Sequence, residues 1–571
     1  MGQEYAAKPR IEIDGTPLPP ELEVHLERAV ADDHTLLPGM VVLRFRDPDR
    51  DLLHRAGFEI GGTVRVLAGP AGQEAREVLA TAEVTGFEAE FDASGSHAVV
   101  RGYDHSHRLH RGRRTETYRN VTDADIARAV AQRVGLEVGR VEDTSIVHRH
   151  VSQANLSDWD FLTARAEEIG LELAVLDSKL ELRKPSEASE APEAGDLASA
   201  NPLQLVLGSD LDSFKPRLTS AEQVREVVVR GWDPDRKEAV VGTAPGKTAS
   251  ASLSREPAEL AARFGEAVFV SVERPLSTQG EVDALAKALA ERIAASFAEA
   301  EGVARGNPKL RAGAAISVGL AGEPFDGLYI VTSARHVFDT DGYRTHFQVS
   351  GRQVRTLLTL AAHGGEANGS TPREASRLPG VVTAKVTTVS DRSDRPCVKL
   401  AFPWLSETYE TDWVRVLQAG AGPERGFVVM PEVDDEVLVA FEHGDIRRPF
   451  VLGGLHNAVD VPPELGGGFA DRRSGGVRAR GFVSRKGHTL VFVDGDGDER
   501  IDVVGGDESV RISLDQAGTT ISVTSKGDVE IEAGGEVSIR GRTLELVASA
   551  GVSIDGGGGD VTVKGTQIRL N

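Results

Sequence analysis

The sequence predicts a mainly β protein of several domains: two β-barrels with a few helices, a small third barrel of the OB fold, and a C-terminal triple-stranded β-helix. Its 571 residues suffice for several hydrophobic cores, since single domains usually contain about 100 to 200 residues. Short segments that alternate apolar and polar residues recur between Gly and Asp turns, as in half-buried antiparallel sheets. From residue 500 onward the chain becomes a near-repeat of such segments.

Three polar stretches rich in Pro, Ala, Ser or Gly divide the chain into domains. They cover residues 184–201, 361–379 and 459–468. The predicted domains are a first barrel with a helical insertion, a second barrel, the small OB barrel and the β-helical segment, at residues 1–183, 202–360, 378–458 and 480–571.

The first two domains repeat the same succession of predicted strands. The two sets are residues 60–69, 81–92 and 95–104, and residues 310–322, 327–339 and 342–352. A further strand, VVVRGWD at 227–233, is similar to AVVRGYD at 98–104. Two similar barrels in one chain would give a trimer a pseudo-sixfold outline, with which it could meet a ring of six subunits.

Few helices are predicted. Two begin at a capping-box spacing and end at a glycine: Thr122 with Asp125 to Gly135, and Ser157 with Asp160 to Gly170. A longer helix follows Gln279, with apolar residues at helical spacing: Val282, Leu285, Leu289, Ile293 and Phe297. We interpret these helices as struts that pack on the barrels.

Residues 380–457 contain five short strands, the number expected for a small closed barrel of the OB type. Such barrels often bind nucleic acid, but residues 380–460 hold 13 acidic and eight basic residues and no interleaved basic and aromatic stripe. A structural use of the barrel is therefore favoured. Cys397 falls in one of its strands and is interpreted as a core residue.

The C-terminal segment repeats apolar pairs at i and i+2, seven to nine residues apart. The pairs are Val529/Ile531, Val537/Ile539, Leu544/Leu546, Val552/Ile554, Val561/Val563 and Ile568/Leu570. One chain of such strands has nothing against which to bury its apolar face, because helices and aromatic residues are absent there. Three intertwined chains would share a core, so the repeat predicts a trimeric β-prism; the alternative is a single-chain β-solenoid.

Composition narrows the possible partners and compartments. The net charge of −23 disfavours nucleic acid and anionic membranes as partners, which leaves protein. The single cysteine can form neither an internal disulfide nor a Cys-based zinc site, so folding in a cytosol is the natural reading. The sequence contains no apolar run of 18 residues, and no signal segment is expected from its polar first residues.

The segment PEVDDEVLVAFEHGDIRRPFVLGGLHN (431–457) closely resembles the barrel signature of the VgrG family of type VI secretion, which also occurs in phage tail spikes and extracellular contractile injection systems. Residues 157–173 and 327–351 are similar to the hub region of that family. The structural motif positions implied by the resemblance are Pro431, Glu432, Asp435, Glu436, Gly444, Asp445, Pro449 and Gly453. Which of these machines uses the chain is left open.

The resemblance implies a homotrimeric central spike of a contractile injection machine. Its hub would lie under a hexameric tail-tube ring among baseplate proteins, its small barrel would form a neck, and its prism would pierce a target envelope. The sequence ends at Asn571 directly after the last strand pair, so we expect a separate PAAR-type tip protein, contacted by Arg569, Leu570 and Asn571. Cargo effectors are further expected partners, and assembly is expected in the bacterial cytoplasm.

The motif search favours no catalytic residue, cofactor or metal site. The chain lacks the Gly-x-Ser-x-Gly, His-Glu-x-x-His and P-loop motifs. His105/His107 and His148/His150 have the spacing of one strand face but too few further ligands for zinc. DGDGDE (494–499) departs from a calcium loop, and GGGGD (556–560) from a calcium nonapeptide, so both are interpreted as turns. A spike with an added wall or glycan hydrolase activity is the alternative function.

Overall fold

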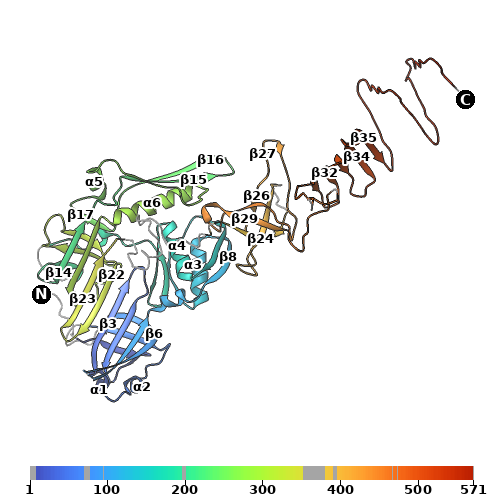
Figure 1. Cartoon of the computed structure of the whole chain (residues 1–571). Helices are drawn as coiled ribbons and strands as arrows, with labels where there is room; N and C mark the ends of the chain where they lie inside the picture. Colours follow the sequence, from blue (N-terminus) through green and yellow to red (C-terminus); the bar gives the residue numbers. More distant parts are fainter. Residues whose placement is uncertain are drawn as a thin grey trace. The chain divides into compact units, whose positions relative to one another are not determined.

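The computed structural model describes residues 8–69, 77–93, 95–195, 201–351, 378, 380–389, 395–465, 467–471 and 474–569. The chain forms two compact units, residues 1–455 and 456–571, which are described separately. Strands predominate in both units, which confirms the mainly β class (Figure 1). In the part of the chain that the structure describes, every helix is too short or too polar to cross a membrane.

An 11-stranded sheet runs through the first unit. In order of pairing its strands are β14 (Leu211–Leu218), β19 (Ala298–Arg305), β23 (Gly342–Val349), β22 (Ser333–Asp339), β3 (Leu26–His34), β4 (Met40–Arg46), β7 (Gly95–Tyr103), β6 (Glu77–Asp92), β5 (Thr63–Ala68), β1 (Arg10–Ile13) and β2 (Thr16–Pro17). Short helices α1 (Pro20–Glu23) and α2 (Leu52–Ala56) border it. The alternating strands put one apolar face into a core around Phe45, Leu43 and Val66.

The two predicted barrels are joined instead of closing separately. Strand β22 of the second predicted domain pairs antiparallel with β3 of the first, with Val337 opposite Val30. An unpaired strand edge exposes a row of N–H and C=O groups, and this pairing satisfies the edges of both halves. Among the described sheets, the closed barrel is the small one of residues 381–454. We call residues 8–351 the hub region.

A helical insertion covers one part of the hub region. Its elements are η1 (His105–His110), β8 (Arg114–Val121), α3 (Asp123–Val134), β9 (Glu137–Val141), β10 (His148–Leu156), α4 (Asp158–Glu168), β11 (Glu172–Leu176), β12 (Lys179–Arg183) and η2 (Ala188–Glu190). The Thr122/Asp125 capping box is present, whereas Ser157 caps α4 by accepting from the Asp160 N–H only. The predicted linker 184–201 is partly packed, since Ala188 is buried and its N–H bonds the Ala249 carbonyl at 2.7 Å.

The remaining hub elements form two small sheets and the long helix that was predicted. The elements are β13 (Gln204–Val206), β15 (Glu226–Asp233), β16 (Glu238–Pro245), β17 (Ala251–Leu253), α5 (Pro257–Ala262), β18 (Val268–Ser271), α6 (Gln279–Ala295), β20 (Ala315–Gly319) and β21 (Gly327–Ile330). Helix α6 lies across β15 and β16 and buries Val227, Val229 and Val240 beneath it (Figure 1). The helix begins at a complete capping box of Thr278 and Glu281.

The small barrel closes through β24 (Val381–Thr388), β25 (Cys397–Ala401), β26 (Val414–Val416), β30 (Pro449–Gly454) and β29 (Glu436–Phe441). A hairpin of β27 (Ala421–Gly422) and β28 (Arg425–Gly426) projects from it, and η3 (Glu442–Gly444) connects its last two strands. Alternate residues such as Val437, Val439 and Phe441 of β29 point into the core, and Cys397 is buried in β25 next to the core residue Val398. The predicted linker at 361–379 lies outside the described residues, apart from Leu378.

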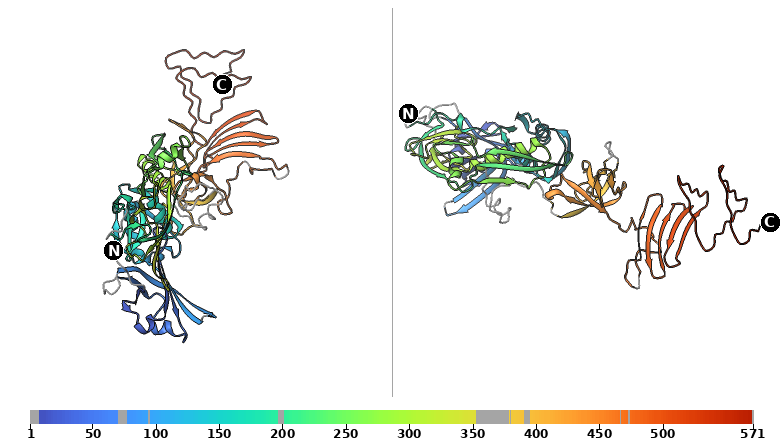
Figure 2. Two further views of the ribbon diagram at one scale, coloured as in Figure 1. Left: turned by 90° about the vertical axis from the view of Figure 1, so that its left-hand side faces the viewer. Right: turned by 90° about the horizontal axis from the view of Figure 1, so that it is seen from above.

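The second unit is a five-stranded antiparallel meander that continues into an extended chain. Its strands are β31 (Ala479–Val483), β32 (Thr489–Gly495), β33 (Asp498–Val504), β34 (Val510–Asp515) and β35 (Thr520–Ser525). Gly495 faces Asp498, so the DGDGDE segment is the hairpin turn that the sequence predicts. After β35 the chain turns back and forth without forming strands over residues 526–569 (Figure 2).

Candidate functional site

The motif segment supplies β29, η3, β30 and the turns between them. Asp435 accepts a hydrogen bond from the Glu432 backbone N–H at 2.7 Å, which closes the turn that Pro431 enters. Glu436 is the first residue of β29 and Pro449 the first of β30. These motif residues therefore set the points at which the barrel strands begin.

The two motif glycines occupy positions with different geometric demands. Gly444 has a φ of 78° and follows His443, whose φ is also positive, so this tight turn needs a left-handed conformation that glycine adopts without strain. Gly453 pairs with Leu438 at a register shift between β29 and β30, where an extra residue bends a strand. The turn at Gly444 brings Asp445 and Arg447 to the junction with the hub region.

Asp445 and Arg447 connect the barrel to the hub region. The Asp445 carboxylate accepts hydrogen bonds from the Arg447 backbone N–H and from its Nη2, the latter at 2.8 Å. The same Nη2 lies 3.3 Å from Oε1 of Glu168, the last residue of α4. Arg448 extends the junction by donating to the Ser277 hydroxyl at 2.7 Å. Charged groups of the motif thus hold the hub helix directly.

Glu168 lies among three guanidinium groups. Arg274 approaches its Oε1 at 3.3 Å, Arg447 at the same distance, and Arg165 contacts Oε2. Burial opposes ionisation, but the three arginines outweigh burial and hold the pKa of Glu168 well below its ordinary value. Removing this carboxylate would leave three arginines with only Asp123 and Asp445 to balance their charge, at restricted exposure. Glu168 and Arg447 lie within the family-like segments 157–173 and 431–457, but no pattern in the sequence distinguishes them from their neighbours.

Strand β10 makes a second contact between the hub region and the barrel. Ser152 shares a hydrogen bond with the Tyr409 hydroxyl at 3.0 Å, and Nε2 of His150 lies 3.1 Å from the Glu410 carbonyl oxygen. Arg119 of β8 donates to the Glu410 carboxylate at 2.9 Å. Ala154 packs into the barrel core itself. The barrel is therefore seated on the helical insertion by both polar and apolar contacts.

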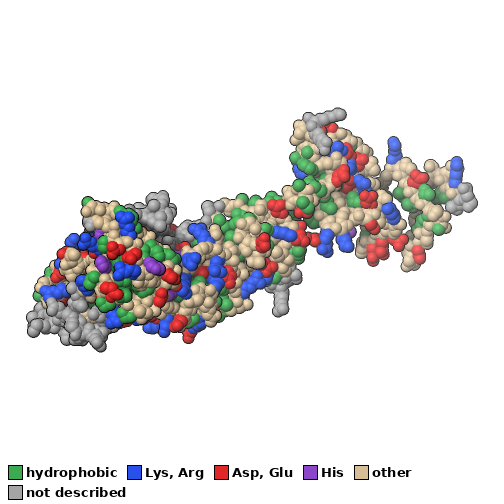
Figure 3. All heavy atoms as spheres, turned by 90° about the horizontal axis from the view of Figure 1, so that it is seen from below, with side chains coloured by type: hydrophobic (Ala, Val, Ile, Leu, Met, Phe, Trp, Pro, Cys, Tyr) green, Lys and Arg blue, Asp and Glu red, His purple; other side chains and the backbone are tan. Residues whose placement is uncertain are grey.

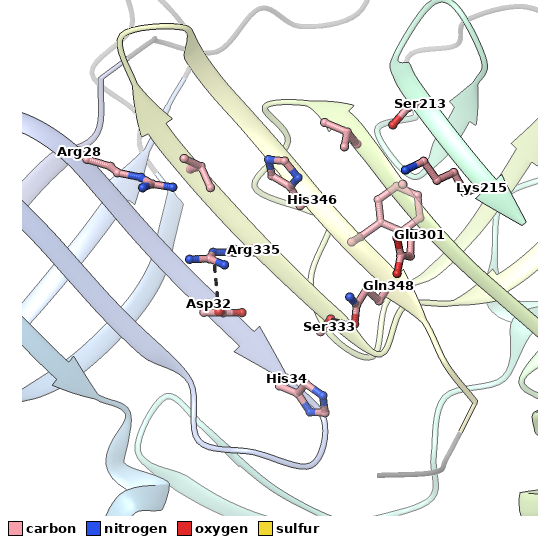
Figure 4. Close-up of a pocket in the computed structure, with 14 residues that line it drawn as sticks. Arg28, Asp32, His34, Ser213, Lys215, Glu301, Ser333, Arg335, His346 and Gln348 are labelled. Atoms are coloured by element: carbon pink, nitrogen blue, oxygen red, sulfur yellow. Dashed lines mark hydrogen bonds and ion pairs between the residues drawn. The ribbon is translucent and has the colours of Figure 1, made fainter. Parts of the chain in front are cut away.

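A polar hollow of about 570 Å³ lies on the outer face of the long sheet, across the β3–β22 pairing. The side chains around it come from β3, β14, β19, β22 and β23 (Figure 4). Its ionisable lining residues are Arg28, Asp32, His34, Lys215, Glu301, Arg335 and His346. Burial is the main reason why the pKa of His346 is lowered, and nearby arginines lower it further. Opposite charges are mixed along this hollow, which is the composition of a solvated sheet face.

A smaller hollow of about 30 Å³ contains two carboxylates with raised pKa values, Asp33 and Asp104. Burial raises the pKa of Asp33 to about 6, with Arg311 opposing it, and burial also raises the pKa of Asp104. Asp104 accepts hydrogen bonds from the Gly39 N–H at 2.7 Å and from Ser106, which positions the surrounding loops. A sugar ring needs a much larger cleft, since ligand sites usually exceed about 300 Å³.

The histidine pairs hold structural hydrogen bonds. The prediction that His105 and His107 share a strand face is wrong, because Asp104 caps a 3-10 helix there and turns the chain. Nε2 of His107 lies 2.7 Å from Glu83, and Nε2 of His148 lies 2.9 Å from the buried Asp123. Within the described ranges, no group of three His, Cys, Asp or Glu side chains has the geometry to hold a metal ion.

The apolar pairs of the C-terminal segment are exposed in the single chain. In the described part of the segment, their eleven side chains are between 53% and 76% exposed. Figure 3 shows hydrophobic side chains at the surface toward the C-terminal end of the chain. Of the predicted tip contacts, Arg569 is exposed, and Leu570 and Asn571 lie outside the described residues.

Two family models match the chain. The type VI secretion system/phage-baseplate injector OB domain matches residues 382–456, which form the closed barrel. The Alg8 N-terminal domain matches residues 55–339, slightly less than half of the chain. The first match assigns the barrel and its motif turns to a known injector domain.

Curated relatives match over short segments. The type VI secretion system spike protein VgrG1c of Pseudomonas aeruginosa is 32% identical over 137 residues, which cover 21% of this chain and 19% of that protein. The actin cross-linking toxin VgrG1 of Vibrio cholerae is 37% identical over 70 residues, which cover 12% of this chain and 6% of that protein. The chain thus matches less than a fifth of the length of these relatives.

Solved structures extend the likeness in fold to most of the chain. A chain of the half-lidded Francisella PdpA-VgrG complex aligns with a TM-score of 0.53 at 9% identity, covering 92% of this chain and 88% of that one. A chain of the lidless complex aligns with a TM-score of 0.50 at 10% identity, covering 92% and 99%. The injector barrel, the curated relatives and this shared fold agree: the chain is VgrG-like, similar to the spike proteins of type VI secretion systems in the sequence of its barrel and to the chains of the PdpA-VgrG complexes in its fold.

Proposed function

We propose that the chain is the central spike and hub of a contractile injection machine and acts as a homotrimer whose C-terminal segment is an intertwined β-prism. Its work is mechanical: contraction of a sheath drives the rigid prism through a target envelope. The observation that carries this proposal is the apolar repeat of residues 529–568, which is exposed in one chain.

The energetics of the repeat favour assembly. Burying a Val, Ile or Leu side chain contributes about 1.5 to 3 kcal/mol, whereas ordering a residue costs about 1 to 2 kcal/mol of backbone entropy. The described part of the repeat leaves its apolar pairs in water and forms no strand pairs over residues 526–569. Three chains wound around one axis would bury these pairs in a common core and pair the strand edges.

The contacts of the barrel support the transmission of force. A spike must pass an axial load from its hub to its needle without bending at the neck. The Glu168, Arg447 and Asp445 network and the seating of β10 on the barrel supply two separate attachments within the first unit. Ion pairs at restricted exposure resist displacement better than solvent-exposed pairs, which contribute little.

The expected partners follow from this role. The hub region would meet a hexameric tail-tube ring and baseplate proteins, and the end of the prism at Arg569, Leu570 and Asn571 would carry a separate PAAR-type tip protein. Cargo effectors would travel with the assembly. Assembly would take place in the bacterial cytoplasm, before the particle is fired or released.

The experiment that tests the trimer is the solution mass of the purified chain and of a shorter chain ending near Pro463. We expect the full chain to have three times its mass of 60.9 kDa and to keep that mass in mild denaturant. The shorter chain lacks the repeat and should associate more weakly. A full-length monomer would contradict the prism and favour a single-chain solenoid.

A hydrolytic activity against cell wall or glycan is the second candidate, and the pair Asp33 and Asp104 is the observation that makes it worth testing. Glycosidases place two carboxyl groups about 5 to 10 Å apart beside the sugar. The hollow at these two carboxylates is about 30 Å³ and both accept backbone hydrogen bonds, so their role is structural in this proposal. A peptidoglycan zymogram without clearing is the expected result.

A further inference from the structure

The hairpin between β26 and β29 forms an exposed apolar arm, residues 417–430. Phe427 is 63% exposed and Val428 is 78% exposed, and Leu417 and Val429 are also exposed. Figure 1 shows β27 standing away from the barrel strands. The apolar side chains of this arm lie in water in the single chain.

The arm is held in a defined conformation by its own hydrogen bonds. The Phe427 N–H donates to the Gly420 carbonyl at 2.9 Å. The Gln418 side chain accepts from the Val429 N–H at 2.9 Å and donates to its carbonyl at 3.1 Å. The conformation is therefore specified although its apolar side chains touch little of the chain. A built apolar protrusion of this kind indicates a contact with another protein surface.

A second exposed apolar surface lies on the sheet of β16, β15 and β18. Helix α6 covers one face of this sheet, and the opposite face carries Trp232, Val241, Val268 and Val270. Val270 lies opposite Val228 in the parallel pairing of β18 with β15 and is 52% exposed. We call this surface the valine face. The valine face lies on a sheet, whereas the arm is a protruding hairpin.

We propose that the arm of one copy of the chain packs on the valine face of a second copy. A closed ring of identical subunits uses a heterologous interface, in which one surface meets a different surface of the neighbour. The arm and the valine face are two different apolar surfaces of the first unit, as a heterologous interface requires. This inference rests on the trimer proposed above and names the hub and neck surfaces that would join its chains.

Charge distribution fits the same pairing. The arm tip carries Glu424 beside Arg425, and the outer side of β15 carries Glu226 and Arg230, so each surface has one charge of each sign. With the arm lying along the sheet, the carboxylate of one copy would meet the guanidinium of the next. Other exposed large apolar side chains of the hub region, such as Val24, Ile60 and Val147, are scattered singly, as is normal for a protein surface.

Disulfide trapping in the full-length chain tests the pairing. The double variant Val428→Cys/Val270→Cys should give covalent dimers and trimers under mild oxidation, while each single variant should give none. Native Cys397 is buried and can stay in place. The matched control is Val428→Cys/Ile60→Cys, because Ile60 is 61% exposed and lies outside the valine face. Cross-linked product at least ten-fold above this control is the expected result.

The possible outcomes separate the inference from the proposed function. Cross-linking of Val428→Cys alone would mean that the arms meet one another, and it would overturn the pairing. A trimeric mass with no cross-link in the double variant would overturn the pairing and leave the trimer intact. A monomeric mass for the unmodified chain would remove the proposed function and this inference together.

Discussion

The barrel and the C-terminal repeat both place apolar residues at alternate positions, but these side chains are buried in the barrel and exposed in the repeat of a single chain. Val437 and Val439 of β29 are fully buried, because the barrel closes through β26 and β30 and each strand covers the next. Val537 and Ile539 of the repeat have the same i and i+2 spacing and are more than half exposed. Alternation therefore predicts a strand with one apolar face, and only closure decides whether one chain or several are needed to cover it.

The largest expected effect breaks the repeat. The double substitution Ile539→Asp/Ile554→Asp would place six carboxylates in the core of a trimer, and an unpaired buried charge costs several kcal/mol. We expect loss of the trimeric mass, measured by sedimentation equilibrium, with the circular dichroism of the first unit unchanged. The control is Asp528→Asn and Asp560→Asn, which change charge without entering the apolar pairs. A trimer that survives both aspartates would refute the shared core.

The next effect tests the junction that holds the barrel on the hub region. Glu168→Gln would remove the negative charge from among Arg165, Arg274 and Arg447 and should destabilise the first unit by about 3 kcal/mol. Chemical denaturation monitored by tryptophan fluorescence measures the change. Asp143→Asn is the control, since the Asp143 side chain is 96% exposed. Equal stability of the two variants would mean that the network contributes nothing.

A smaller effect tests whether the core of the barrel is completed within one chain. Val439→Ala would leave a cavity in a closed core and should lower the free energy of unfolding by about 2 kcal/mol. Because the barrel is completed within one chain, the loss should be the same at low and high protein concentration. Val537→Ala in the repeat should instead lower stability in a concentration-dependent way. Thermal unfolding at two concentrations that differ a hundred-fold distinguishes the two responses.

The smallest expected effect concerns acid. Hydrogen bonds from Arg108 are the main cause that lowers the pKa of Glu83 to about 2, with burial opposing and His107 contributing. A glutamate in the unfolded chain has a pKa of about 4.3. The stabilisation by ionised Glu83 is therefore complete above that pH and is lost as the pH falls through about 2. Glu83→Gln should remove about 1 kcal/mol at pH 7 and progressively less as the pH falls from about 4 through 2. A stability profile with the same slope as the parent would contradict the assignment.

Local features of the fold were predictable from the sequence, whereas distant pairings were not. The spacing from Val282 to Ile293 predicted α6, and the five strands of residues 380–457 predicted the barrel, because both signals lie within one segment. The pairing of β22 with β3 joins residues about 300 positions apart and leaves no periodic trace in either strand. Helix spacing gives the i,i+3 pair of Arg165 and Glu168, but Arg274 and Arg447 come from distant segments, so no spacing rule could find the complete junction.

The two-residue turn and the short repeats of the second unit allow its length to change during evolution. Gly495 and Asp498 close a hairpin in which Asp498 pairs with Arg478 beside the neighbouring strand β31, and each apolar pair of the repeat is separated from the next by only a few residues. In arrays of this kind each unit interacts chiefly with its neighbours, so units can be duplicated or lost without redesign of the rest. The reach of the protein is thus a quantity that insertion and deletion of whole repeats can adjust stepwise, while the hub and barrel stay unchanged.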